Sequence, residues 1–165
     1  MTSSNTTALF PADDHDHADC VRQAMAQAEG YCGRSGLRLT ELRHRVLELI
    51  WANHQPVGAY HLLEQLNNDG RKAAPPTVYR SLDFLLEHGL IHRISSLNAF
   101  VGCSHPGHPH AGQFLICTDC GKVNEISEEV LGSGLRQVAR TAGFHTRKPV
   151  VELLGTCAHC GRRDH

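Results

Sequence analysis

Residues 75–103, PPTVYRSLDFLLEHGLIHRISSLNAFVGC, decide the fold of this chain. Proline suits the first turn of a helix, and the apolar residues that follow recur at helical spacing until Gly89, which can end the helix. Two short stretches with strand character come next, over 90–95 and 99–103, and Ser-Leu-Asn joins them in the manner of a β-hairpin. A helix closed by such a hairpin predicts a winged helix-turn-helix.

Three further helices are predicted upstream of this stretch. The first covers about 18–36, the second begins after Thr40, which is a good N-cap residue, and the third covers about 59–68. Each has apolar residues on one face, as expected for helices that pack around a shared core. We therefore expect a winged-helix domain over 18–103, preceded by a mobile polar tail over 1–17.

The second half of the chain has a different pattern. A linker over 104–112, rich in His, Pro and Gly, leads to strand, turn, strand, helix and strand, which predict a small α/β domain over 113–165. The fold class expected for the whole chain is therefore α+β. The apolar face of the second domain is limited, and a second subunit often completes such a sheet, so we expect a dimerisation domain and a homodimer.

Composition excludes a membrane protein and leaves the question of nucleic acid open. No apolar run approaches the roughly 18 residues that span a bilayer, and the N-terminus lacks a signal-peptide pattern, so we expect a cytoplasmic protein with no membrane partner. The net charge is −1, without the global excess of basic residues typical of nucleic-acid binding. Residues 31–95 carry eight Lys and Arg against six Asp and Glu, a weakly basic balance that decides nothing.

Two Cys-x-x-Cys pairs predict a structural zinc site. Each pair is followed by glycine, so both sulfur atoms can face one ion, and two pairs complete a tetrahedral four-thiolate site. The alternative is a thiol redox pair, which would need one cysteine of low pKa at the N-terminus of a helix, whereas both pairs are expected to flank strands. The predicted ligands are Cys117, Cys120, Cys157 and Cys160.

A second group of possible metal ligands lies between the two domains. If the hairpin turn is centred after Leu97, His92 and Cys103 face each other across the strands, at a Cβ separation of about 4.5 to 5.5 Å. His110 at the end of the linker and Glu125 on the second strand of the α/β domain can then supply the remaining ligands. On spacing alone, the reading of each as a surface or hairpin residue stays open.

The helix that opens with the double proline has an outward face suited to DNA. Because its apolar residues are buried, Thr77, Tyr79 and Arg80 are candidate contacts near its N-terminal end, the end that such helices insert into the major groove. Arginine in particular can form a bidentate contact with guanine. The alternative is an ordinary amphipathic helix with a solvated Arg and Tyr.

The stretch PPTVYRSLDFLLEHGLIHRI resembles the recognition helix and wing of the ferric uptake regulator (Fur) family, and its double proline and SLDFLLE run are similar to the zinc uptake regulator (Zur) branch. The resemblance begins at LRLTELRHRVLELI, includes FLICTDCGKVNEI and ends at the second Cys-x-x-Cys pair. It implies a winged-helix DNA-binding domain, an α/β dimerisation domain and two zinc ions per subunit, one structural and one regulatory. By resemblance, the regulatory ligands are His92, Cys103, His110 and Glu125.

The expected function is therefore that of a zinc-responsive repressor. As a dimer with regulatory zinc bound, it would bind palindromic double-stranded operator DNA and control genes of zinc uptake and homeostasis. A Fur-family sensor of iron, nickel or peroxide is the first alternative, and the soft thiolate of Cys103 argues against it. A zinc-ribbon redox enzyme is the second, but no nucleophile, base and substrate pocket can be assembled, so neither catalysis nor a small-molecule substrate is expected. A third metal site built from His105, His108 and His145 stays open.

Overall fold

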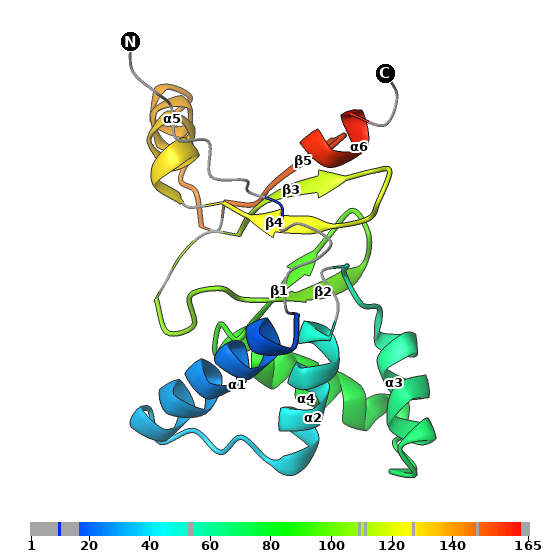
Figure 1. The fold of residues 1–165 in the computed structure, drawn as a ribbon. Coiled ribbons are helices and arrows are strands. Elements are labelled where there is room, and N and C mark those ends of the chain that lie inside the picture. The colour runs from blue at the N-terminus through cyan, green and yellow to red at the C-terminus, as the bar shows by residue number, and fades with distance from the viewer. Residues whose placement is uncertain are drawn as a thin grey trace.

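The computed structural model describes residue 10 and residues 17–52, 55–108, 110, 112–126, 128–147 and 149–162. The predicted N-terminal tail lies outside these residues, apart from Phe10 and from His17, where the first helix begins. The described elements form two stacked groups (Figure 1). We call residues 17–103 the N-terminal lobe and residues 112–162 the C-terminal lobe.

Four helices make up most of the N-terminal lobe. Thr40 caps the second helix by accepting a hydrogen bond from the N–H of Arg43 at 3.4 Å, as predicted. The fourth helix has proline in its first turn and ends at Glu87, two residues before Gly89, whose φ of 64° is readily adopted only without a side chain. The helices are α1 (His17–Arg34), α2 (Glu41–Trp51), α3 (Ala59–Asn68) and α4 (Pro75–Glu87).

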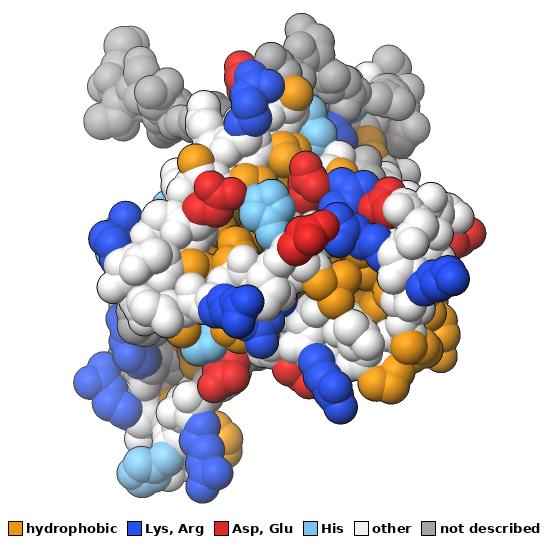
Figure 2. All heavy atoms as spheres, turned by 90° about the horizontal axis from the view of Figure 1, so that it is seen from below, with side chains coloured by type: hydrophobic (Ala, Val, Ile, Leu, Met, Phe, Trp, Pro, Cys, Tyr) orange, Lys and Arg blue, Asp and Glu red, His pale blue; other side chains and the backbone are white. Residues whose placement is uncertain are grey.

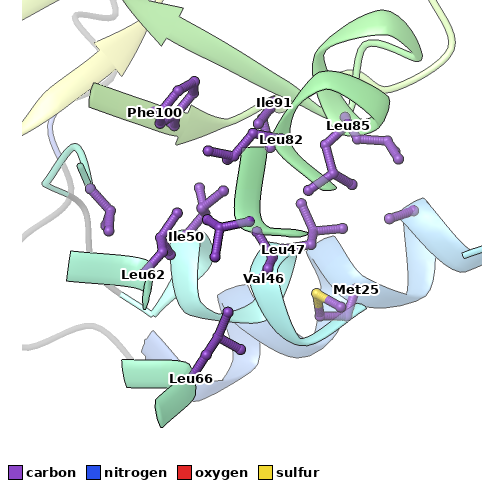
Figure 3. Packing of buried hydrophobic residues seen from close by; sticks show 14 of the residues in the cluster. Met25, Val46, Leu47, Ile50, Leu62, Leu66, Leu82, Leu85, Ile91 and Phe100 are labelled. Atoms are coloured by element: carbon purple, nitrogen blue, oxygen red, sulfur yellow. The ribbon is translucent and has the colours of Figure 1, made fainter. Parts of the chain in front are cut away.

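The core of this lobe fixes α4 against α2 and α3. Leucine and isoleucine side chains of the three helices point toward a common centre (Figure 3), and each buried side chain stabilises the fold by roughly 1.5 to 3 kcal/mol. Because one face of α4 packs into the core, its opposite face points to solvent. The fully buried members include Leu47, Ile50, Leu62, Leu66, Leu82 and Leu85.

A two-stranded hairpin, the wing, closes the N-terminal lobe. Its strands are β1 (Ile91–Ile94) and β2 (Ala99–Gly102), and a single bridge from Val57 to Phe100 ties β2 to the segment before α3. At Gly102 an added Cβ would lie 2.1 Å from the ring of Trp51, so β2 approaches α2 as closely as only glycine allows. The wing is therefore held firmly on the helices.

The register of the wing differs from the one predicted. His92 pairs with Val101 rather than with Cys103, so the predicted opposition of the two ligands was wrong. The turn is centred one residue earlier than expected, with the N–H of Asn98 bonded to the carbonyl of Ser95 at 3.3 Å and Asn98 at a φ of 47°. A shift of pairing by two residues preserves the face of the sheet, so His92 and Cys103 still lie on the same face as diagonal neighbours.

The C-terminal lobe is a three-stranded sheet with a crossover helix. Strand order is β4-β3-β5, with β3 antiparallel to β4 and parallel to β5, and α5 connects β4 to β5. Its elements are β3 (Gln113–Cys117), β4 (Val123–Glu125), α5 (Glu128–Thr141), β5 (Val151–Gly155) and α6 (Ala158–Gly161). The α+β fold class predicted from the sequence is confirmed. No helix among the described residues is long and apolar enough to cross a membrane.

One row of the C-terminal sheet faces the wing. Phe114 of β3 pairs with Glu125 on β4 and with Glu152 on β5, so the three side chains share one face. Phe114 is 1% exposed and packs in a small cluster with Ile94 of the wing and with Ile116. This row is where the sheet of one lobe contacts the hairpin of the other.

Candidate metal centres and nucleic-acid interface

Four potential ligands converge at the junction of the lobes. They come from four separate segments: β1, the residue after β2, the linker, and the end of β4. One donor atom from each lies within 4.8 Å of every other, and all four side chains are buried or half-buried. The structure thus brings together His92, Cys103, His110 and Glu125, the set expected from the sequence.

The individual distances match the spacing of ligands around one ion. Nε2 of His92 and Nε2 of His110 are 3.1 Å apart and lie 2.9 and 2.6 Å from Oε1 of Glu125, while Sγ of Cys103 is 3.5 Å from Nε2 of His110. Ligands bonded at about 2.0 to 2.3 Å in a tetrahedron are about 3.3 to 3.8 Å from one another. The nitrogen and oxygen donors therefore need to move apart by about 0.2 to 0.7 Å to surround one ion.

Neighbouring groups orient these side chains. Nδ1 of His110 faces the carbonyl oxygen of His108 at 2.5 Å, which requires a proton on Nδ1 and leaves the lone pair of Nε2 free for a metal. The other carboxylate oxygen of Glu125 accepts the N–H of Ser104 at 3.1 Å, so Oε1 is left to face the two imidazoles. Each donor is thus aimed at a common centre.

The surroundings shift the pKa values of Glu125 and Cys103 in opposite directions. Burial alone would raise the pKa of Glu125, but the hydrogen bond and charge of His92, with the N–H of Ser104 and with His110, lower it to about 2. Burial, reinforced by the charge of Glu125, raises the pKa of the Cys103 thiol to about 12. The cluster therefore holds one carboxylate that is already ionised and one thiol that must lose its proton to bind a metal.

The four cysteines of the Cys-x-x-Cys pairs form a second cluster. Parallel pairing of β3 with β5 places Cys117 beside Gly155, so both pairs lie at the same end of neighbouring strands. The four sulfur atoms lie within 4.8 Å of one another, with 4.0 Å between Cys120 and Cys157. Sulfur atoms bonded to zinc at about 2.3 Å are about 3.8 Å apart in a tetrahedron.

The backbone around this cluster favours a thiolate. Burial would raise the pKa of Cys117, but the N–H groups of Cys157, Cys120 and Asp119 point at its sulfur and lower the pKa to about 6. One expectation needs correction: Cys157 precedes the four-residue helix α6, so the second pair does not simply flank a strand. The redox alternative gains nothing from this, because a fourfold grouping of sulfur atoms serves a metal and not a dithiol.

The outward face of α4 carries the three predicted DNA contacts. Thr77, Tyr79 and Arg80 are all exposed, with Tyr79 at 47%. Tyr60, at the start of α3, was not predicted although it is 80% exposed, and its signal in the sequence was an aromatic residue in the first turn of an otherwise apolar-faced helix. Both tyrosines border a groove of about 410 Å³ between α3, α4 and the wing, where Arg93 also lies.

The surface around α4 does not carry an excess of basic side chains that would by itself indicate DNA binding. Figure 2 views the molecule from the end that carries the helices of the N-terminal lobe, and shows Lys and Arg side chains spread over this face with Asp and Glu between them. Several basic side chains are engaged in ion pairs, among them Arg45 with Asp69 at 2.7 Å and Arg71 with Glu41 at 2.7 Å. Recognition by shape and by individual side chains is favoured over a general basic patch.

The third metal site left open by the sequence is not assembled. Among the described residues, only the two clusters above bring three or more potential ligands together. His105 lies with its ring centre 6.5 Å from that of His110, and neither His108 nor His145 belongs to a cluster.

Apolar side chains are exposed on one part of the C-terminal lobe. They come from α5, from the loop after it and from β5, which is an edge strand of the sheet. Unpaired edge strands with exposed apolar residues favour association. The most exposed are Val138 at 69%, Phe144 at 68% and Leu154 at 59%.

Comparison with known proteins gives a consistent result. The model of the ferric uptake regulator family matches residues 34–154. The zinc uptake regulation protein of Escherichia coli (strain K12) is 39% identical over 141 residues, covering 85% of this chain and 82% of that protein. A solved zinc uptake regulator complexed with zinc and DNA has 38% identity and a TM-score of 0.80, with 87% of this chain and 97% of that one covered.

A further pair of solved structures bears on the arrangement of the lobes. Holo XcZur is 40% identical with a TM-score of 0.77, covering 85% of this chain and 98% of its own. Apo XcZur is 39% identical, covering 87% and 99%, but its TM-score is only 0.51. At nearly the same sequence identity, the present structure is therefore more similar in overall arrangement to the holo structure than to the apo structure.

Proposed function

Because this chain belongs to the ferric uptake regulator family, we propose that it is a zinc-responsive transcriptional repressor. It binds palindromic operator DNA as a homodimer when regulatory zinc is bound, and controls genes of zinc uptake and homeostasis. The observation that carries this proposal is the convergence of two imidazoles, one thiol and one carboxylate between the two lobes. A metal there contacts both lobes at once.

The donor set favours zinc over the metals of the alternative sensors. One thiolate, two imidazoles and one carboxylate are a tetrahedral set that suits zinc, whereas iron and manganese sites prefer imidazole and carboxylate with more ligands. Cys103 is 3% exposed, so its sulfur is reserved for the site rather than for solvent chemistry. We propose His92, Cys103, His110 and Glu125 as the ligands of the regulatory zinc.

The cysteine cluster serves a second, structural zinc. Cys117, Cys120, Cys157 and Cys160 fit a closed four-thiolate site with no position for substrate, and the backbone amides around Cys117 already favour its ionised form. A metal here supplies folding free energy by joining the end of β3 to the segment after β5. This gives two zinc ions per subunit, with no catalytic role for either.

The C-terminal lobe supports dimerisation, and the N-terminal lobe supports DNA contact. The exposed apolar surface of α5 and β5 is the part that a second copy of the chain would cover. Thr77, Tyr79 and Arg80 on α4 are then the base and phosphate contacts, with Tyr60 beside them. We keep the division into a DNA-binding domain over 18–103, a hinge over 104–112 and a dimerisation domain over 113–165, in a cytoplasmic protein.

Regulation follows from where the ligands sit. His92 and Cys103 belong to the wing, and Glu125 belongs to the sheet of the other lobe, so a bound zinc restrains the angle between them. A dimer can place both α4 helices in one palindrome only when their separation matches about one helical turn of DNA, roughly 34 to 36 Å, or a multiple. Zinc therefore acts as corepressor by selecting this spacing.

The test is DNA binding measured across buffered free zinc. Duplexes are first selected from a randomised palindromic library in the presence of zinc, and binding of the selected duplex and of a scrambled one is then followed by fluorescence anisotropy. We expect zinc to strengthen binding to the selected duplex alone. Binding that ignores zinc, or that responds equally to iron or nickel at their buffered cellular concentrations, would overturn the proposal.

A further inference from the structure

Glu152 joins the two lobes without a metal. Its carboxylate accepts the N–H of Ser95 at 2.6 Å through Oε1 and the N–H of Ser96 at 3.0 Å through Oε2. Ser95 and Ser96 form the turn at the tip of the wing, and Glu152 lies on β5 of the other lobe. Both oxygens of a charged group are thus engaged by backbone donors, the kind of hydrogen bond that is stronger than one between neutral groups.

The sheet of the C-terminal lobe places Glu152 opposite Glu125. Both are register partners of Phe114, one on each side, so they occupy the same face about 10 Å apart, which is twice the spacing of neighbouring strands. Glu125 approaches the base of the wing, where His92 and Cys103 lie. Glu152 approaches its tip.

Two separated attachments restrain orientation in a way that one cannot. A metal at the base of the wing leaves some rotation about that point, limited by packing of the wing on Phe114 and Ile116 and by the hydrogen bond from Gln55 to the carbonyl of Cys120 at 2.8 Å. A second attachment at the tip of the wing restrains this rotation further. The N–H groups of Ser95 and Ser96 can bind only one acceptor each, so the contact exists in the closed arrangement and is replaced by water when the lobes separate.

The restrained turn is also close to the groove beside α4. The side chain of Arg93 donates to Oδ1 of Asn98 at 2.8 Å, and both residues border the groove that contains Tyr60 and Tyr79. The turn that Glu152 contacts therefore belongs to the same unit as the outward face of α4, because the wing is packed on the helices of its own lobe.

We propose that Glu152 is a positioning residue for zinc-dependent DNA binding: it holds the tip of the wing on the dimerisation sheet, so that zinc at the base of the wing completes the DNA-competent orientation. The inference rests on the proposed function. Because the contact favours the conformation that binds zinc and DNA, it lowers the free zinc concentration needed for operator binding. Loss of the contact raises this concentration without removing a zinc ligand.

The variants distinguish the loss of the hydrogen bonds between Glu152 and the wing from the loss of one negative charge. Glu152→Ala removes both acceptors. Ser96→Pro removes the N–H and the hydroxyl with which Ser96 hydrogen-bonds to Glu152. It does so at the second position of a turn that already carries the hydrogen bond from Asn98 to Ser95, where proline is favoured. The matched control is Glu64→Gln on α3, which removes one negative charge from a side chain that is 70% exposed.

Free zinc at half-maximal binding of the selected duplex is measured for each protein, with zinc content and mass from native mass spectrometry. We expect at least about a fivefold increase for Glu152→Ala, because a fivefold change is the size of one net hydrogen bond and Glu152 accepts more than one. Ser96→Pro should act in the same direction, and the double variant should be no worse than Glu152→Ala. All variants should keep two zinc ions per subunit and the dimer, and Glu64→Gln should match the parent protein.

A second readout does not depend on DNA. Hydrogen exchange at the amides of residues 95 and 96 should be protected in the zinc-bound parent protein and fast in Glu152→Ala. Unchanged exchange together with an unchanged zinc midpoint would overturn the proposal. If the parent protein shows no zinc dependence at all, the proposed function fails instead, and protection of the two amides still reports on the contact. Should Glu152→Ala dissociate the dimer, Ser96→Pro on the other lobe carries the test.

Discussion

Replacing Cys103 by serine tests whether the cluster between the lobes is the zinc sensor. Zinc binding to a four-ligand protein site has an apparent free energy of about 10 to 16 kcal/mol at pH 7, or about 2.5 to 4 kcal/mol for each ligand. Burial and the charge of Glu125 raise the pKa of the Cys103 thiol to about 12, so part of the gain is offset by loss of a proton. We therefore take the lower end of the range, which corresponds to about a 100-fold loss of zinc affinity.

The assay follows operator binding and zinc content in parallel. For Cys103→Ser we expect half-maximal DNA binding at about 100-fold higher free zinc. The dimer and the zinc at the cluster of the two Cys-x-x-Cys pairs should be retained. Cys20→Ser is the matched control, because Cys20 lies on α1 outside both clusters. Wild-type zinc dependence in Cys103→Ser would refute the assignment of the sensor to this cluster.

Four other outcomes are expected. Cys117→Ser removes a ligand of the structural zinc, so the C-terminal lobe should lose its cooperative thermal transition and the dimer should dissociate; a native-like melting curve with dimeric mass would contradict this. Arg80→Ala should weaken operator binding by about 1 to 3 kcal/mol and leave zinc content intact, whereas equal losses on scrambled DNA would reduce Arg80 to a phosphate contact. Zinc binding should release about one proton from Cys103, so affinity falls as pH falls; calorimetric titrations in two buffers of different ionisation enthalpy measure the number, and zero release would exclude thiolate ligation. Gly102→Ala places a methyl group against Trp51 and should lower the free energy of unfolding by about 1 to 3 kcal/mol in denaturant titrations, while an unchanged midpoint would mean that the ring moves freely.

Local signals in the sequence were sufficient for most of the fold. The cap at Thr40, the double proline and Gly89 are interactions within a few residues, so the limits of α2 and α4 could be read from the chain. The Cys-x-x-Cys spacing likewise carries its own geometry. The short helix α6 was not predicted, because four residues are too few to show a helical pattern of apolar residues.

Features that depend on distant residues could not be predicted in the same way. The register of the wing is set by the left-handed backbone at Asn98, which moves the centre of the turn by one residue and the partner of His92 from Cys103 to Val101. The ligands still converged because a change of two positions keeps the same face. The contact of Glu152 spans 57 residues, and its only local sign was a single acid in an apolar strand.

The parallel pairing of β3 with β5 has a consequence for the order in which the molecule matures. Among the described residues, the core of the N-terminal lobe consists of residues up to Phe100, so we expect this lobe to fold while the ribosome is still extending the chain. The C-terminal sheet forms later, because its central strand β3 pairs with β5, which is synthesised near the end of the chain. The N–H that donates to the sulfur of Cys117 likewise belongs to Cys157, 40 residues downstream. We therefore expect the DNA-binding surface to form before the dimerisation surface, and dimerisation to require zinc at the cysteine cluster.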